Sequence, residues 1–73
     1  MIGALKGTVY SVHTNRTILF VGDVGYRVFI TGRYAKTLTI NKKILLYIHS
    51  HIREDAFDLY GFPTEEELSL FEL

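Results

Sequence analysis

The chain has 73 residues, of which 48% are hydrophobic and 14% aromatic, and it contains no cysteine. This length holds one small domain and excludes most enzymes, and the composition excludes a disordered segment, a disulfide framework and a thiolate zinc site. All eight basic residues precede position 54, where Asp23 is the only acid, so the first 53 residues carry +7 and the last 20 carry −7. Such segregation indicates a polyanion-binding body with an acidic appendage, or two halves that neutralise each other in the fold or across a subunit contact.

The first half of the chain predicts three short strands. Residues 5–12, rich in Thr, Val and Tyr, predict the first strand, with Gly3 and Gly7 as bend or bulge points. The second and third strands are predicted at residues 17–21 and 26–30. They are joined by a tight hairpin turn made of Gly22, Asp23, Val24 and Gly25, because these residues include two glycines that tolerate positive φ.

The second half predicts two longer strands after an irregular connection. Residues 31–41 break the alternation and predict a connection with a helical turn, before a fourth strand over residues 42–52. Four residues then interrupt two apolar runs with charge, which predicts an exposed hairpin tip at Arg53, Glu54, Asp55 and Ala56. Residues 57–62 predict the fifth strand. Five strands of this length predict an all-β fold, a closed barrel of the OB type.

A helix is predicted over residues 64–73. Thr64 followed three residues later by Glu67 forms a capping box, and three glutamates in the first turn suit the positive end of the helix dipole. The helix has no glycine cap or basic last turn, and its apolar residues have little to pack against. We therefore expect residues 1–62 to form a barrel domain and residues 63–73 to begin a second domain that is absent from this chain.

Each candidate site has a simpler structural explanation. The Gly22-x-x-Gly25 step lies between strands, so a hairpin turn is favoured over a phosphate-binding loop. His49 and His51 share a strand face, but no third ligand is assured, and we expect no metal and no cofactor. Glu54 and Asp55 could be paired catalytic carboxylates, but nothing nearby in the sequence suggests a nucleophile or a cleft. An exposed charged turn is therefore the favoured interpretation of these two residues.

The aromatic residues could include base-stacking platforms, but most are expected to fill the core. This set comprises Tyr10, Phe20, Tyr26, Phe29, Tyr34, Tyr47, Phe57, Tyr60 and Phe62. No apolar run approaches the roughly 20 residues that span a bilayer. The start of the chain also lacks the long apolar centre of a signal peptide, so we expect a cytoplasmic protein with no membrane partner.

Three collinear segments carry a family resemblance. They are the opening Met1-Ile2-Gly3-x-Leu5-x-Gly7, the segment Val21-Gly22-Asp23-Val24-Gly25-Tyr26-x-Val28, and Arg53-Glu54-Asp55-Ala56-x-x-Leu59-Tyr60-Gly61-Phe62 followed by Glu66-Glu67-x-x-x-Phe71. The chain thereby resembles, over its whole length, the N-terminal domain of the RuvA family of Holliday junction branch-migration proteins. The resemblance is weakest at residues 31–43, where this chain is shorter than the family.

The resemblance implies a non-catalytic DNA-binding subunit for recombination and repair. It implies an OB barrel that assembles as a homotetramer, on whose basic face a four-way (Holliday) junction lies, with Glu54 and Asp55 as an acidic pin at the crossover. We expect Arg53, beside the pin, to contact a phosphate. The helicase activity would belong to the hexameric ATPase motor RuvB, engaged through a C-terminal region missing here, and the second domain would carry helix-hairpin-helix motifs.

Two other interpretations remain open at the level of sequence. The barrel could be a protein-interaction or oligomerisation domain with little DNA binding of its own. It could also be a generic OB domain that binds single strands.

Overall fold

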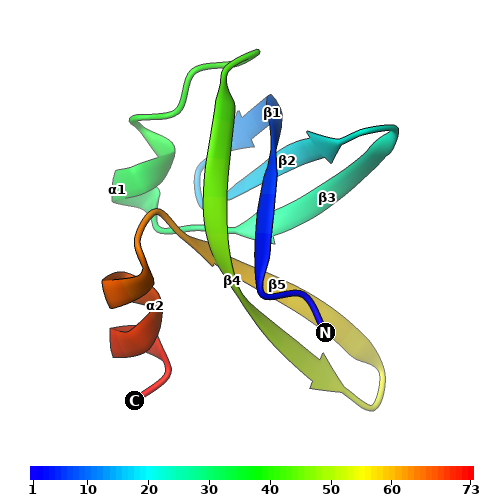
Figure 1. The fold of residues 1–73 in the computed structure, drawn as a ribbon, viewed down its shortest axis with the longest axis vertical. Helices are drawn as coiled ribbons and strands as arrows, with labels where there is room; N and C mark the ends of the chain where they lie inside the picture. The colour runs from blue at the N-terminus through cyan, green and yellow to red at the C-terminus, as the bar shows by residue number, and fades with distance from the viewer.

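The computed structural model describes residues 1–73 as a closed five-stranded barrel with two short helices (Figure 1). The strands close in the order β1-β2-β3-β5-β4, and every neighbouring pair is antiparallel except β3 and β5, which run parallel. The elements are β1 (Ala4–His13), β2 (Arg16–Val21), β3 (Val24–Phe29), α1 (Gly32–Ala35), β4 (Lys43–Arg53), β5 (Ala56–Phe62) and α2 (Glu65–Phe71). The predicted all-β barrel of the OB type is confirmed, and each strand lies within two residues of its predicted bounds. No helix has the length and apolar character needed to cross a membrane.

The turn between β2 and β3 is shorter than the sequence predicts. Only Gly22 and Asp23 lie between β2 and β3, whereas Val24 and Gly25 belong to β3. Gly22 has a φ of 62° and Asp23 has no positive φ, which is the pattern of a type II′ hairpin turn. The irregularity in β1 falls between Val9 and Ser11 rather than at Gly3 or Gly7. The helical turn expected in residues 31–41 is α1, whose first turn is capped by the Thr31 side chain.

The barrel core is aliphatic, so the prediction that most aromatic residues fill it is wrong. The largest side chains that are fully buried are Leu19, Leu46, Val9 and Val28, and Phe62 is the only buried aromatic residue. The interior of a small five-stranded barrel is narrow, and its close-packed walls leave room for branched aliphatic side chains rather than for rings. The aromatic rings lie at the margins of the barrel and on its outer surface.

Two glycines on the strands show how closely the barrel walls approach the interior. A Cβ at Gly61 would lie 2.6 Å from Val28 Cγ1 and 3.1 Å from Leu46 Cδ1, and a Cβ at Gly7 would collide with the Phe20 carbonyl. Both glycines are buried. At these points the strands pack against their neighbours without any intervening side chain, and this position of Gly61 draws β5 into the barrel.

Helix α2 begins as the sequence predicts. The Thr64 hydroxyl accepts a hydrogen bond from the Glu67 amide at 3.1 Å and lies 3.3 Å from Glu67 Oε2. The expectation that its apolar residues have little to pack against holds for Leu70 and Leu73, which are exposed, but it is wrong for Phe71. The Phe71 ring lies 4.9 Å from the Phe62 ring and 5.4 Å from the Tyr60 ring, measured between centroids.

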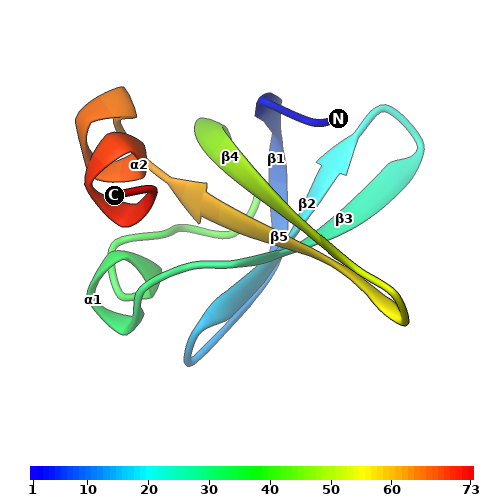
Figure 2. The ribbon, with the colours of Figure 1, turned by 90° about the horizontal axis from the view of Figure 1, so that it is seen from below.

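The two helices and the β4–β5 hairpin occupy opposite sides of the molecule. Figures 1 and 2 show α1 and α2 together on one side, while β4 and β5 extend beyond the barrel on the other as a two-stranded ribbon. Burial and, to a lesser extent, the charge of Glu67 raise the pKa of Tyr34 on α1, which is consistent with the nearness of the two helices. The residues predicted as the acidic pin therefore lie at the end of a ribbon that projects away from the helical side.

Candidate nucleic-acid interface

The acidic tip of the β4–β5 ribbon is a two-residue turn. Arg53 at the end of β4 is paired in register with Ala56 at the start of β5, so only Glu54 and Asp55 lie between the strands. Both side chains are exposed. A turn this short fixes the two carboxylates at the outermost point of the ribbon, where they can approach a partner before any other part of β4 or β5 does.

Arg53 is held beside this tip by an ion pair that sequence reasoning missed. Its Nη2 donates to Asp58 Oδ2 at 2.9 Å, across the hairpin from β4 to β5. The signal was present in the sequence, because opposite charges flank the two-residue turn and occupy diagonal positions on one face of the ribbon. Since a guanidinium carries five N–H donors, this single bond leaves Arg53 with donors for a phosphate.

The remaining basic residues have no acidic partner within the chain. Only Arg53 among the eight cations forms an ion pair, and the other seven are exposed: Lys6, Arg16, Arg27, Arg33, Lys36, Lys42 and Lys43. Direct ion pairs between the basic and acidic halves of the chain are limited to Arg53–Asp58 and His49–Glu72, so most of the charge is not neutralised by contacts in the fold. Neutralisation across a subunit contact stays a prediction. The basic surface stays available to a polyanion.

The two histidines belong to an aromatic cluster that joins α2 to the barrel. His49 Nδ1 lies 2.9 Å from Glu72 Oε2, and the His49 ring lies 5.5 Å from the Phe71 ring and 6.4 Å from the His51 ring, between centroids. No group of three or more histidine, cysteine or acidic side chains is placed to hold a metal ion. The geometry therefore gives His49 a role in docking α2.

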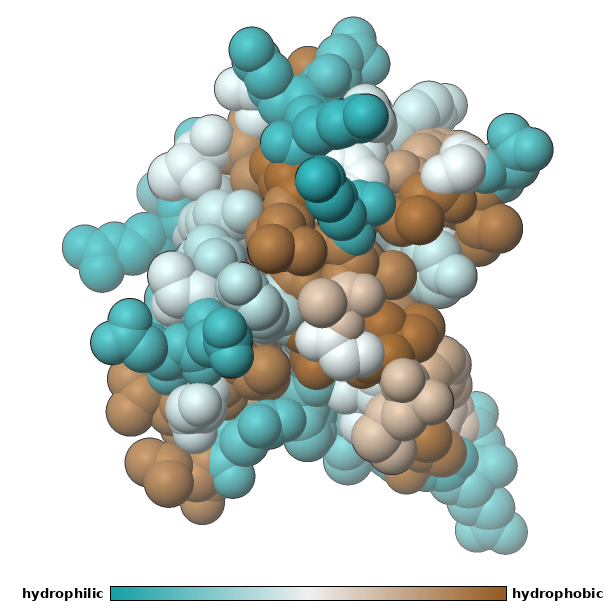
Figure 3. Space-filling view, viewed as in Figure 1, coloured by the Kyte–Doolittle hydropathy of each residue, from teal (hydrophilic) through white to brown (hydrophobic).

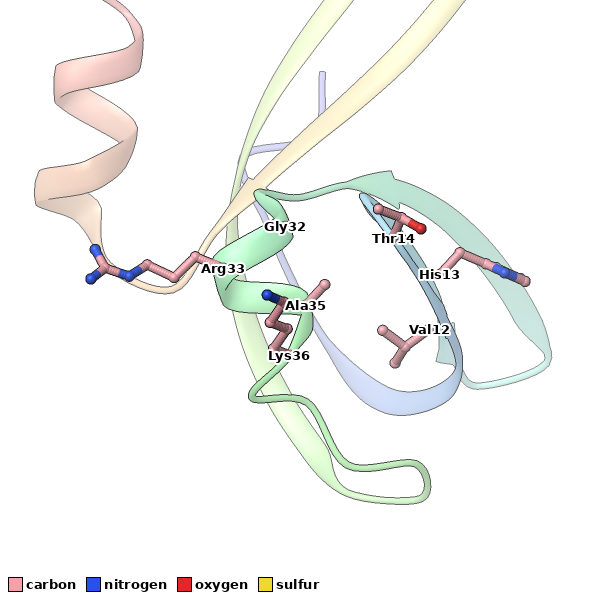
Figure 4. Close-up of a pocket in the computed structure, with 7 residues that line it drawn as sticks. All are labelled: Val12, His13, Thr14, Gly32, Arg33, Ala35 and Lys36. Atoms are coloured by element: carbon pink, nitrogen blue, oxygen red, sulfur yellow. The ribbon is translucent and has the colours of Figure 1, made fainter.

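An open hollow of about 590 Å³ lies between α1 and the β1–β2 turn, and its lining includes two cationic side chains, Arg33 and Lys36, together with His13. Figure 4 shows Arg33 extending toward α2, away from His13 and Thr14. The cations therefore do not converge on a common point, and the hollow does not form a built anion site.

A smaller cavity of about 230 Å³ lies beside the aromatic cluster, where Phe29, Tyr60, Phe62 and Phe71 contribute to its lining. It contains no charged side chain. Its polar lining consists of Asn15, Thr31 and Tyr60.

Comparison with known proteins identifies the family. The family described as "RuvA N terminal domain" matches residues 1–61. Proteins named Holliday junction branch migration complex subunit RuvA from Halothermothrix orenii and Magnetococcus marinus are 44% and 43% identical to this chain, over 99% and 100% of its length. A protein of the same name from Azorhizobium caulinodans is 45% identical over the whole chain.

The chain spans only 36–37% of the length of these relatives. The matched region nevertheless contains the five strands up to Gly61 and the turn that carries the two carboxylates. Both the fold and the match extend over nearly all of the described residues, and on these grounds the chain belongs to the RuvA N-terminal domain family.

Proposed function

We propose that this chain is the DNA-binding, pin-bearing part of a Holliday junction branch-migration subunit. The observation that carries the proposal is the pair of exposed carboxylates, Glu54 and Asp55, at the tip of a ribbon that projects from a barrel with seven exposed, unpaired cations. Its family membership supports the same function, because the relatives are named as subunits of that complex.

The acidic pin, Glu54 and Asp55, acts by repelling phosphates. The unpaired cations attract DNA from any direction, but a linear duplex that settles across the tip brings its phosphates toward two carboxylates. At about 7 Å in water, each phosphate–carboxylate pair costs about 0.6 kcal/mol. An open four-way junction avoids this cost, because its strands separate at the crossover and leave room for the pin.

Arg53 contributes the attraction nearest to the pin. Its guanidinium is oriented by Asp58 and keeps free donors, so it contacts a backbone phosphate where the strands leave the crossover. The seven other cations add further phosphate contacts along the arms.

The proposal gives the chain no chemical step of its own. Its sequence contains no P-loop, so ATP hydrolysis in the complex belongs to a separate motor of the RuvB kind. Residues 1–62 form the barrel domain that assembles as a homotetramer around the junction, and residues 63–73 begin a second, helix-hairpin-helix domain.

The experiment compares binding of a four-way junction and of a linear duplex by the full-length protein. Glu54→Gln combined with Asp55→Asn removes both charges and keeps the shape of the tip. We expect duplex affinity to rise and the junction-to-duplex preference to fall about tenfold, as loss of about two phosphate–carboxylate repulsions implies.

The matched control is Glu65→Gln combined with Glu66→Gln. It removes the same charge from exposed positions on α2, on the opposite side of the molecule, and we expect the preference to stay within twofold of the native value. An equal fall in both variants would assign the effect to net charge and contradict the pin. Salt-insensitive binding to both DNAs would favour an oligomerisation domain instead.

A further inference from the structure

A pair of exposed apolar side chains lies directly behind the acidic pin. Ile52 on β4 and Phe57 on β5 face each other in register, one residue from Arg53 and Ala56 respectively. Ile52 is 61% exposed and Phe57 is 54% exposed. The two side chains lie on the same face of the ribbon, because directly paired residues of antiparallel strands share a face.

This pair continues the face of the ribbon that forms the barrel core. Ile48 and Leu59 lie on the same face, by the alternation along β4 and β5, and both are buried. The core covers this face only over the part of the ribbon that belongs to the barrel. Beyond it, Ile52 and Phe57 extend the apolar face into solvent, and Figure 3 shows apolar surface running from the barrel along the lower ribbon toward a hydrophilic tip.

The opposite face of the ribbon has a different chemistry. His51, Arg53 and Asp58 lie there, and the Arg53–Asp58 ion pair occupies its end. The two faces of the ribbon near the pin therefore differ. One face carries charged side chains and suits charged groups, and the other carries apolar side chains and suits flat, uncharged groups. Large apolar side chains kept in solvent at the end of a projecting ribbon indicate a binding surface.

We propose that Ile52 and Phe57 form a wedge that contacts nucleobases unstacked at the junction crossover, with the Phe57 ring stacking on one of them. This inference rests on the proposed function, since it takes DNA at the pin as given. Two residues of strand span about 7 Å, so a crossover that surrounds Glu54 and Asp55 lies within one or two base steps of the wedge.

Nucleobases fit this surface better than backbone phosphates do. The carboxylates at the tip repel phosphates, and the wedge offers phosphates no hydrogen-bond donor, whereas strand separation exposes uncharged base faces that stack on aromatic rings. Stacking on the wedge therefore offsets part of the free energy that is lost when the pin unstacks the bases.

Cross-linking tests the contact directly. The full-length protein is bound to a four-way junction that carries 5-iododeoxyuridine at the crossover, irradiated, and mapped by mass spectrometry. We expect a cross-link at Phe57, its loss in Phe57→Leu, and its retention in Phe57→Tyr, which keeps the ring.

Permanganate reactivity of crossover thymines gives a second readout. The native protein is expected to make these thymines reactive, and Phe57→Ala to lower that reactivity at least fivefold, the smallest change that loss of an aromatic–base stack implies. The dependence of affinity on salt is expected to stay unchanged, because no phosphate contact is lost. The control, Val24→Ala, removes an exposed apolar side chain from the β2–β3 hairpin and should leave reactivity at the native level.

The outcomes separate this inference from the proposed function. Native junction preference together with no cross-link at Phe57 and unchanged thymine reactivity in Phe57→Ala overturns the wedge and leaves the pin intact. A lower solution mass of Phe57→Ala by light scattering, without a cross-link, assigns the surface to a subunit contact and also overturns it. Absence of junction preference in the native protein contradicts the proposed function itself.

Discussion

At Gly61, any added side chain would enter the packed interior of the barrel. An added methyl group would lie 2.6 Å from Val28 Cγ1 and 3.1 Å from Leu46 Cδ1, and both of these side chains are fully buried. Because neither can move into solvent, we expect Gly61→Ala to lower the free energy of unfolding by about 1–3 kcal/mol. Urea denaturation followed by circular dichroism measures the change.

Gly3 provides the comparison for that measurement. A Cβ there meets no atom within 4 Å, so Gly3→Ala is expected to change the free energy of unfolding by less than about 0.5 kcal/mol. Similar losses in the two variants would show that the close approach of Gly61 to the core does not limit stability.

At the scale of elements, α2 depends on its contact with the barrel. A seven-residue helix is marginal alone, and Phe71 supplies its ring contacts with Tyr60, Phe62 and His49. We expect Phe71→Ala to reduce hydrogen-exchange protection of the Leu68 and Glu72 amides at least tenfold, since each aromatic pair contributes about 0.5–1.5 kcal/mol. Protection of the Ile48 amide in the barrel should not change.

Leu70→Ala is the matched control, because Leu70 lies on the same helix and is exposed. In the Leu70→Ala variant, the Leu68 and Glu72 amides should exchange at the rates of the native protein. If both variants lose protection equally, then helix propensity rather than docking on the barrel stabilises α2.

The sequence predicts elements whose signals are local. The five strands, the acidic hairpin tip and the Thr64 cap follow from alternation, a charged interruption and a capping box, each contained within a few neighbouring residues. The Arg53–Asp58 pair was also local, because opposite charges flank the two-residue turn, but the docking of Phe71 and the aliphatic core depend on strand arrangement and barrel radius. These are properties of the closed barrel, so residue patterns alone led to the wrong expectation about the aromatic side chains.

At the scale of the whole molecule, the charge distribution separates attraction from repulsion. Seven cations without partners surround the barrel, while all acids except Asp23 gather on the pin, on α2 and its C-cap, and on β5 beside Arg53. Long-range attraction depends on salt and is insensitive to DNA sequence, whereas the pin acts only on groups that reach the tip. Affinity and structural selectivity therefore reside on different parts of one small surface and can be altered independently.

The salt dependence of junction binding tests this separation. Arg53→Gln is expected to lower the slope of log affinity against log salt by about 0.9, the value for one lost phosphate contact, and Arg53→Lys to restore it because a lysine still neutralises a phosphate. The pin variant Glu54→Gln with Asp55→Asn loses no phosphate contact, so its slope should not fall. Titrations from 50 to 200 mM salt cover about the range in which such slopes are resolved. An unchanged slope in Arg53→Gln would show that Asp58 holds the guanidinium away from DNA, and the attraction would then come from the unpaired cations alone.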